Sequence, residues 1–303
     1  MLPDNRNNKF NSRFYGRNRR DDRRHDSKKD MDGKRQRFMR KARSGVSTAY
    51  VASAADHSII QAINAYNELE RVRNTIYERL EEWYGAYFPN VRLENHDTFA
   101  RLVSKVSSRD VDDAMLVEVL GNEAQHIADK IRSSTGFPSI DIEEYKALKE
   151  LAEYELRLAD VQKGLDAFIE MQTKKVMPNI VYLIDYKIAA EMLSKAGSLD
   201  RLANMPASTI QLLGAERALF KHMKYGSRPP KYGFLFKLPE LAMMNKKDKG
   251  RMARIYATKI CIAARADAIS KRFIADALKE QIQKARKRNN EKLAGGEEKD
   301  RED

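Results

Sequence analysis

The side chains of this sequence best suited to chemistry are basic, and the chemistry they suit is phosphate recognition. Residues 206–220 read PASTIQLLGAERALF, and Gly214 and Ala215 leave a spot there without bulky side chains, where a backbone or a phosphate can approach closely. Three cations follow at helical spacing and share one helix face, namely Arg217, Lys221 and Lys224. The alternative is a solvated basic face in which the glycine serves helix packing.

Two further polar side chains belong to the same run. Gln211 precedes the glycine and is a candidate contact for the same ligand. Glu216 is a lone acid beside Arg217, where it can accept a hydrogen bond from a base edge or a 2′-hydroxyl, or simply orient Arg217.

A proline-rich loop supplies a second group of candidates. Pro229 and Pro230 stiffen residues 225–233, which reduces the entropy lost on binding. The loop presents a mixture suited to phosphate contact and base stacking, made of Arg228, Lys231 and Tyr232. The alternative is a merely rigid surface turn.

The last predicted helix, from about Lys247 to Arg288, carries a third basic element. At about 100° per residue, five cations fall within roughly a 60° arc: Lys247, Arg251, Arg254, Arg265 and Arg272. The opposite side carries small residues for close packing, among them Ala253, Ala263 and Ala264. A narrow cationic stripe suits a phosphate backbone, although a solvated helix face can show the same spacing.

The sequence contains no catalytic constellation. Its five histidines show no metal-ligand spacing, and Cys261 lies on an alanine-rich face that favours a packing role over that of a nucleophile. The patterns GxxxxGKS or GxxxxGKT, GxGxxG and GxSxG do not occur. We therefore predict a protein that is not an enzyme and that uses no cofactor and no metal.

Long helices must position these residues. Ile59, Ala62, Tyr66, Leu69, Arg73, Ile76, Leu80 and Trp83 repeat at steps of three and four, within a helix expected from about Val46 to Trp83. A weaker seam with three polar members follows at Leu148, Leu151, Glu155, Leu158, Gln162, Leu165, Ile169, Gln172 and Val176. Such heptads predict an antiparallel coiled coil with a helical tip at 84–140, in which 97–106 and 111–131 are helical. The alternative is a compact bundle.

The predicted fold class is all-α. Changes in composition and the position of Pro178 divide the chain into four segments. They are a basic disordered tail at 1–45, the coiled coil with its tip at 46–177, a compact helical domain at 178–288 and a charged tail at 289–303. The break at 177 rests on Pro178, which cannot continue a helix. Within the compact domain, Gly197-Ser198 marks a helix stop and start, and 234–236 is expected to be a short extended piece.

Charge restricts the class of partner. The chain of 303 residues has a net charge of +13, and residues 1–45 hold sixteen Lys or Arg against six Asp. That balance favours nucleic acid or an anionic membrane surface. The tail is then either a solubilising segment or a non-specific RNA-contacting arm. One cysteine excludes an intrachain disulfide, and no run of about 18 apolar residues is present.

Three runs of the sequence resemble the Nop domain: PASTIQLLGAERALF, RPPKYGFLFKLPEL and KGRMARIYATKICIAARADAISKRF. That domain occurs in archaeal and nucleolar box C/D ribonucleoprotein core proteins and in a spliceosomal relative. The run IIQAINAYNELERVRNTIYERLEEWYGAYFP is similar to their first coiled-coil helix, and MPNIVYLIDYKIAAEMLSKAGSLDRLA to their junction segment. The resemblance covers about residues 56–275, and GAER and RPPKYG are closer to the box C/D type.

The resemblance implies a scaffold that grips a kink-turn RNA together with its small RNA-binding protein, in a particle that guides 2′-O-methylation of ribosomal RNA. It implies that the motif Gly214–Arg217 and the Pro230-Lys231 loop meet the RNA and its bound protein. The helix from Arg251 to Arg265 would line the same face. A second copy would pair through the coiled coil, and the methylation chemistry would belong to a partner subunit.

Full-length box C/D members carry a folded amino-terminal domain that holds the methyltransferase fibrillarin, and only residues 1–45 precede the coiled coil here. We therefore expect that another chain supplies that domain, or that this is a divergent paralogue with a different client. The carboxy-terminal tail lacks the long lysine/glutamate repeats of the nucleolar members, which favours an archaeal, cytoplasmic protein; a eukaryotic member would be nucleolar.

Two other classes of function remain as alternatives. One is a coiled-coil adaptor for proteins, attracted to RNA only through its basic tail. The other, ranked last, is a basic protein on an anionic membrane, because the seams are ordinary heptads and not strongly amphipathic interfacial helices.

Overall fold

The computed structural model describes residues 53–297, apart from the side chains of Lys247 and of residues 289–297. The predicted tail at 1–45, the start of the first predicted helix and the last six residues lie outside this range. Within it the chain is helical and contains no strand, which confirms the predicted all-α class. Among these helices, none is long and apolar enough for a membrane span.

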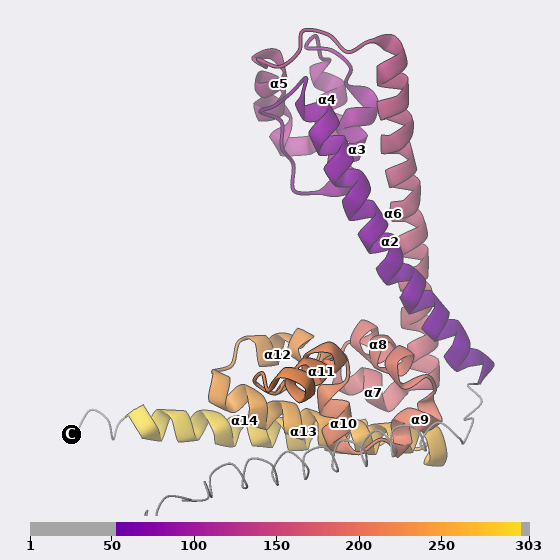
Figure 1. The fold of residues 1–303 in the computed structure, drawn as a ribbon, viewed down its shortest axis with the longest axis vertical. Coiled ribbons are helices and arrows are strands. Elements are labelled where there is room, and N and C mark those ends of the chain that lie inside the picture. Colours follow the sequence, from indigo (N-terminus) through magenta and orange to yellow (C-terminus); the bar gives the residue numbers. More distant parts are fainter. Residues whose placement is uncertain (1–52, 298–303) are drawn as a thin grey trace, which may run out of the picture. The chain divides into compact units, whose positions relative to one another are not determined.

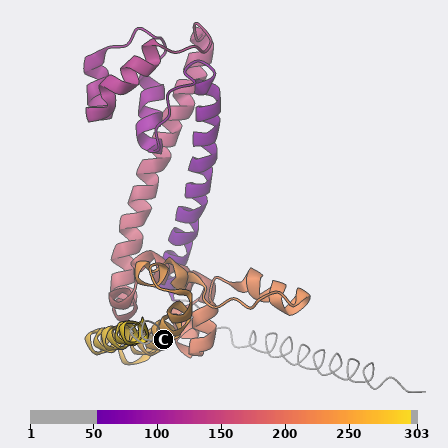
Figure 2. The same cartoon turned by 90° about the vertical axis from the view of Figure 1, so that its left-hand side faces the viewer.

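Two long helices, α2 (Ala54–Gly85) and α6 (Ile142–Val176), run side by side in both views (Figures 1 and 2). Side-chain oxygens cap both amino-terminal ends, because Ser53 accepts from the Asp56 amide at 3.1 Å and Asp141 accepts from the Glu143 amide at 3.0 Å. The chain reverses direction in the tip between them, so the pair is antiparallel. This confirms the predicted pairing.

The seam on α6 differs from the predicted one. The buried residues of α6 are Leu148, Ala152, Glu155, Ala159, Gln162, Ile169 and Thr173. The predicted positions Leu151, Leu158 and Leu165 are only half-buried, because Ala152 and Ala159 allow the helices to approach more closely than leucines would. On α2, Trp83 lies at the margin of the seam with 37% exposure. Its indole donates to Glu144 at 2.6 Å.

Four short elements form the tip of the helix pair: α3 (His96–Lys105), α4 (Asp113–Leu120), the 3₁₀ turn η1 (Gly121–Glu123) and α5 (Ala124–Arg132). Their own core includes Phe99, Leu116 and Ile131 and packs on Leu80 and Leu148. The segment predicted to be helical over 111–131 is helical from Asp113, but it is divided at Gly121, whose φ of 58° an α-helix cannot contain.

The carboxy-terminal half consists of short helices around α13 (Lys246–Arg265). They are α7 (Pro178–Leu183), α8 (Tyr186–Ala196), α9 (Leu199–Asn204), α10 (Ala207–Leu212), α11 (Glu216–Tyr225), η2 (Phe234–Lys237) and α12 (Pro239–Ala242). Pro178 begins α7, and Gly197 in the left-handed region is followed by Ser198, which caps α9. These starts and stops were predicted; the extended piece at 234–236 was not found, because η2 is a 3₁₀ helix.

The last predicted helix is broken. After α13, residues Ala266–Ser270 form a π-helical turn (η3), Lys271 adopts a left-handed φ of 54°, and α14 (Ala275–Glu297) begins anew. Neither proline nor glycine marks this break. The buried carboxylate of Asp267 accepts from the backbone amides of Asn179 and Ile180, both at 3.1 Å. Arg272 therefore does not continue the face of α13, which corrects the predicted stripe.

Polar contacts tie the long helices to the carboxy-terminal half. Asp56 accepts from the Leu199 amide at 3.0 Å, and Lys187 lies 3.0 Å from both the Tyr66 hydroxyl and the Asp166 carboxylate. Burial alone lowers the pKa of Lys187, but its bonds to Tyr66 and Asp166 outweigh burial, so the pKa is raised. A shared core that includes Ile59, Ile169 and Leu193 continues beneath these contacts.

Candidate nucleic-acid interface

The structure brings four of the predicted site residues to one surface cavity of about 570 Å³. Gln211 comes from α10, Lys231 from the proline-rich loop, and Arg251 and Arg254 from successive turns of α13. Lys231, Arg251 and Arg254 are exposed at the cavity. Three guanidinium or ammonium groups that converge on an open cavity give a surface to which phosphate oxygens can bind.

Backbone contacts hold the loop against α10. The Gln211 side-chain amide donates to the carbonyl of Lys231 at 2.6 Å, so it positions the loop as well as lining the cavity. The Gly233 amide donates to the Gln211 carbonyl at 2.9 Å, and the Phe234 amide donates to the Leu213 carbonyl at 2.7 Å. Lys231 is therefore presented from a braced loop.

Gly214 has a different role from the one predicted. It adopts a left-handed φ of 86°, and a Cβ on it would meet the ring of Phe234 at 2.8 Å. The space on that side is thus filled by an aromatic ring. One carboxylate oxygen of Glu216 accepts from the Gly214 amide at 2.8 Å, so the side chain braces this turn. The GAER motif is a rigid turn that leads from α10 into α11.

Helix α11 carries Arg217 and Lys221 away from the cavity, and neither lines it. The helix buries none of its residues, and it projects from the body in Figure 2. Its apolar side chains are exposed beside the cations: Phe220 at 58%, Met223 at 40% and Tyr225 at 68%. A helix with apolar and basic groups, both solvent-facing, suits a protein surface as well as a phosphate backbone.

The remaining predicted residues lie elsewhere. Arg228 is exposed in the loop but does not line the cavity. Arg265 ends α13 about 16 Å beyond Arg254 along the helix axis. Its guanidinium donates to the Ala203 carbonyl at 3.2 Å. Tyr232, expected to stack on a base, is half-buried and already stacks on Phe236 with ring centroids 5.5 Å apart.

Sequence reasoning missed two polar groups of the cavity, Ser208 and Lys246. Lys246 precedes Gly250 and Arg254 at four-residue spacing, a signal that could have placed it on the same face of α13. Ser208 stands in the second position of α10 and carried no comparable signal.

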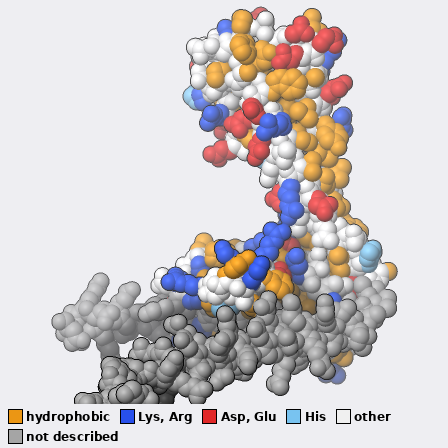
Figure 3. Space-filling view, in the orientation of Figure 1, with side chains coloured by type: hydrophobic (Ala, Val, Ile, Leu, Met, Phe, Trp, Pro, Cys, Tyr) orange, Lys and Arg blue, Asp and Glu red, His pale blue; other side chains and the backbone are white. Residues whose placement is uncertain are grey.

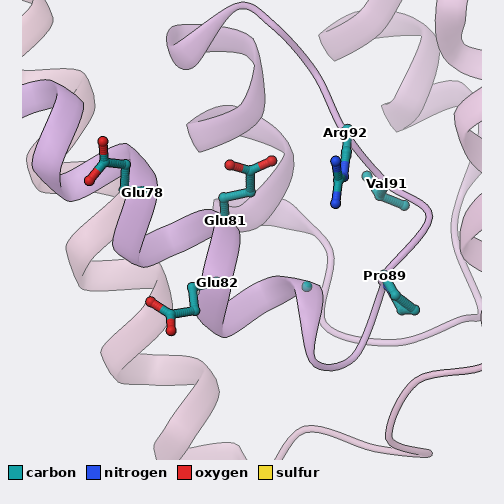
Figure 4. Close-up of a pocket in the computed structure, with 7 residues that line it drawn as sticks. Glu78, Glu81, Glu82, Pro89, Val91 and Arg92 are labelled. Atoms are coloured by element: carbon teal, nitrogen blue, oxygen red, sulfur yellow. The ribbon is translucent and has the colours of Figure 1, made fainter.

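Charge differs between the two ends of the molecule. Figure 3 shows Lys and Arg side chains over the lower helices and acidic side chains gathered on the tip. A second cavity, of about 400 Å³ in the tip, is lined by Glu78, Glu81 and Glu82 with Arg92 opposite (Figure 4). Three carboxylates repel phosphate, so the tip cavity does not suit a nucleic acid.

Among residues 53–297, no group of three or more His, Cys, Asp or Glu side chains is arranged to hold a metal ion. The features present are a helical body, a cationic cavity and a projecting helix with mixed chemistry. Together they define a helical scaffold protein whose surface suits polyanionic ligands.

Comparison with known proteins identifies the family. Residues 65–288 match the family model Nop, described as snoRNA binding domain, fibrillarin, and the chain belongs to this family. An uncharacterized NOP5 family protein of Methanocaldococcus jannaschii is 36% identical over 239 residues, which are 77% of this chain and 57% of that protein. Nucleolar protein 58 of Debaryomyces hansenii is 34% identical over 227 residues, 73% of this chain and 43% of that protein.

The chain spans about half the length of these curated relatives. A solved structure titled as a fibrillarin/NOP5P complex aligns with 72% of this chain and 76% of its own chain, at 23% identity and a TM-score of 0.38. The family membership therefore rests on the sequence match.

Proposed function

We propose that the chain is an RNA-binding scaffold subunit of a box C/D-type ribonucleoprotein. It recognises a kink-turn RNA together with the small protein bound to it, and it supports guided 2′-O-methylation without performing the reaction. The observation that carries the proposal is the cationic cavity of Lys231, Arg251 and Arg254 in a chain that matches the snoRNA-binding family model.

Two ligand surfaces with different chemistry support the composite target. The cavity offers the exposed cations Lys231, Arg251 and Arg254, which suit the RNA backbone. Helix α11 exposes the apolar side chains of Phe220, Met223 and Tyr225, which suit the surface of the small protein bound to the RNA. The neighbouring cations Arg217 and Lys221 suit the RNA where it borders that protein. Fibrillarin is proposed as the methyltransferase partner, because the matched family model is described as snoRNA binding domain, fibrillarin.

A gel-shift comparison tests the proposal. Kink-turn RNA is offered bare and saturated with its small protein, and we expect much tighter binding in the second state. Lys231→Ala and Arg254→Ala should weaken both states, whereas Phe220→Ala should remove only the gain given by the small protein. Lys149→Ala, an exposed lysine of α6, is the matched control and should change neither.

Equal affinity for bare and occupied RNA would contradict the composite target. Deletion of residues 1–45 distinguishes this function from that of a protein adaptor that binds RNA non-specifically through its basic tail. The scaffold retains its preference for the occupied RNA after the deletion, whereas an adaptor loses RNA binding altogether.

We further propose that a second copy packs along α6. Beside the buried seam, a second set of apolar residues repeats at steps of four and three: Tyr154, Leu158, Val161, Leu165 and Phe168. Tyr154 and Val161 are 48% and 54% exposed, and the other three are half-buried. Hydrophobic side chains follow this side of the long helices in Figure 3. A second heptad stripe on one helix is typical of a further helix–helix interface.

We infer the cellular location of the protein from its relatives. A relative named as nucleolar and a relative from an archaeon both match. We propose nucleolar residence in a eukaryotic cell and cytoplasmic residence in an archaeal one.

A further inference from the structure

Two exposed aromatic side chains meet just beyond the end of α13 that lies away from the cavity. Tyr182 of α7 and Phe273, in the segment between η3 and α14, contact edge to face with ring centroids 5.4 Å apart. Tyr182 is 42% exposed and Phe273 53%. Neither ring belongs to the buried core. The pair is therefore displayed at the surface.

The backbone under Phe273 is fixed by a buried side chain. Asn179 donates from its side-chain amide to the Arg272 carbonyl at 2.9 Å, and its side-chain oxygen accepts from the Ile274 amide at 2.7 Å. These bonds bracket Phe273 on both sides. Asn179 is itself held by Asp267, whose carboxylate accepts from the Asn179 side chain at 2.7 Å. An aromatic ring on a braced segment loses little entropy when a ligand binds it.

Tyr182 is fixed in a similar way. Its hydroxyl bonds to the carboxylate of Asp276, which raises the pKa of Tyr182. The ammonium of Lys279 lies 4.4 Å from the centroid of the Tyr182 ring. The Tyr182 ring thus has a carboxylate at its hydroxyl and an ammonium over its face. The two residues that precede Phe273 are also exposed cations, Lys271 and Arg272.

We propose that Tyr182 and Phe273, with Arg272 and Lys279, form a platform on which single-stranded RNA stacks its bases. Aromatic rings interleaved with cations are the chemistry of sequence-tolerant single-strand binding. An apolar protein partner is disfavoured because the Lys279 ammonium lies over the Tyr182 ring and two exposed cations, Lys271 and Arg272, directly precede Phe273. The choice of RNA as the polyanion rests on the proposed function. The platform is distinct from the cavity, which uses the opposite half of α13, a helix about 30 Å long.

The test uses the full chain and a fluorescent ten-nucleotide oligouridine that carries 4-thiouridine. Irradiation should link the RNA to a peptide that contains Tyr182 or Phe273. By anisotropy, Phe273→Ala should weaken binding by about ten-fold, the effect of losing one stacked base. Phe137→Ala is the matched control, since Phe137 is an aromatic residue of the tip with 64% exposure. Arg272→Glu gives a second variant that leaves both rings in place, and it should also weaken binding.

The outcomes separate this proposal from the previous one. Crosslinks confined to residues 1–45 or to the cavity, or equal affinity of the Phe273→Ala and Phe137→Ala variants, overturn the platform and leave kink-turn recognition standing. Loss of the preference for protein-bound kink-turn RNA, with oligouridine still linked near Phe273, overturns the kink-turn proposal and leaves the platform. Circular dichroism of each variant should match that of the parent chain.

Discussion

At the scale of single residues, the loop that presents Lys231 depends on a close approach between two backbone segments. A Cβ on Gly233 would lie 1.7 Å from the carbonyl oxygen of Leu213. The nearest atoms belong to the backbone of Leu212 and Leu213 and not to a flexible side chain, so a side chain at position 233 must displace that backbone.

Gly233→Ala should therefore cost about 1–3 kcal/mol of stability and weaken binding of kink-turn RNA. Urea denaturation and a gel shift measure the two effects. Gly250→Ala is the matched variant, because Gly250 lines the same cavity on α13 and a Cβ added there meets nothing within 4 Å. It should raise stability by about 0.5–1 kcal/mol. A Gly233→Ala variant more stable than the Gly250→Ala variant would contradict the packing argument.

The sequence indicated which residues carry charge but not which of them meet. Arg251 and Arg254 were placed on one face because helical periodicity is local. Gly214 was expected to make room for a ligand, whereas it makes room for Phe234, a contact across twenty residues that no local pattern encodes. Likewise, no local pattern predicted that one carboxylate oxygen of Glu216 accepts a hydrogen bond from the Gly214 amide.

At the scale of elements, a buried polar cluster sits between α2 and α6. Arg73 donates to Glu155 at 2.8 Å, to Gln162 at 2.6 Å and to Asp97 of α3 at 2.5 Å. Glu155 is fully buried, and its second carboxylate oxygen has no partner. Without Arg73, a carboxylate would remain in the seam with no countercharge.

Arg73→Met should destabilise the protein by about 3–5 kcal/mol, because a buried charge loses its partner. The double variant with Glu155→Leu should recover most of that loss, since an apolar pair of similar volume replaces the ion pair. Chemical denaturation of the single and double variants measures both. If the double variant were as unstable as the single one, the cost would lie in packing and not in charge.

Asp97 gives the same cluster a pH dependence. Its burial pushes the pKa of the carboxyl up, but the hydrogen bond from Lys163 and the charges of Arg73 and Lys163 outweigh burial, so the pKa is lowered. The unfolded chain then binds this proton more readily than the folded one. Stability from Asp97 is thus complete above the ordinary pKa near 4 and is lost as pH falls through the lower folded value.

Asp97→Asn should remove that part of the acid sensitivity. The difference in unfolding free energy between the parent and the variant should be largest at neutral pH and shrink below about pH 4. The variant must be compared with the parent because burial raises the pKa of Asp267. A raised pKa makes the contribution of Asp267 to stability grow as pH falls, which is opposite to the effect of Asp97. A difference that stays constant from pH 7 to pH 3 would exclude the ionised Asp97 as the cause.

Element boundaries followed the sequence wherever a cap or a proline marked them, as at Pro178 and Ser198. They departed from it where a distant side chain decided. The break after Arg265 arises because Asp267 caps α7, far away in the sequence, and Asn179 fixes residues 272 and 274 in return. Heptad counting found the pairing of α2 and α6, but alanines shifted the buried seam on α6 by one residue at alternate positions.

At the scale of the whole molecule, that shift explains why apolar side chains remain on the outside of the helix pair. Leu158 and Leu165 are displaced from the intramolecular seam, and with Tyr154, Val161 and Phe168 they form a stripe rotated by roughly 100° from it. Leu165 and Phe168 also pack in part against the core, so Tyr154 and Val161 are the most exposed members of the stripe. Helix α6 can thus pack against α2 through one face and against a second copy through the adjacent face. Glu155 lies in the buried seam, and other charged residues of α6, such as Arg157, Asp160 and Lys163, occupy the remaining arc.

Val161→Glu should abolish association of two copies, because Val161 is exposed at the middle of this stripe and a carboxylate there would be buried without a partner. Light scattering coupled to size exclusion should show twice the chain mass for the parent and the single mass for the variant, with unchanged helicity. Val117→Glu is the matched control, since Val117 is a valine of the tip with 57% exposure. It should remain dimeric. A parent chain that stays monomeric at tens of micromolar would show that the stripe serves a different partner, and RNA binding by the isolated subunit would then proceed without a second copy.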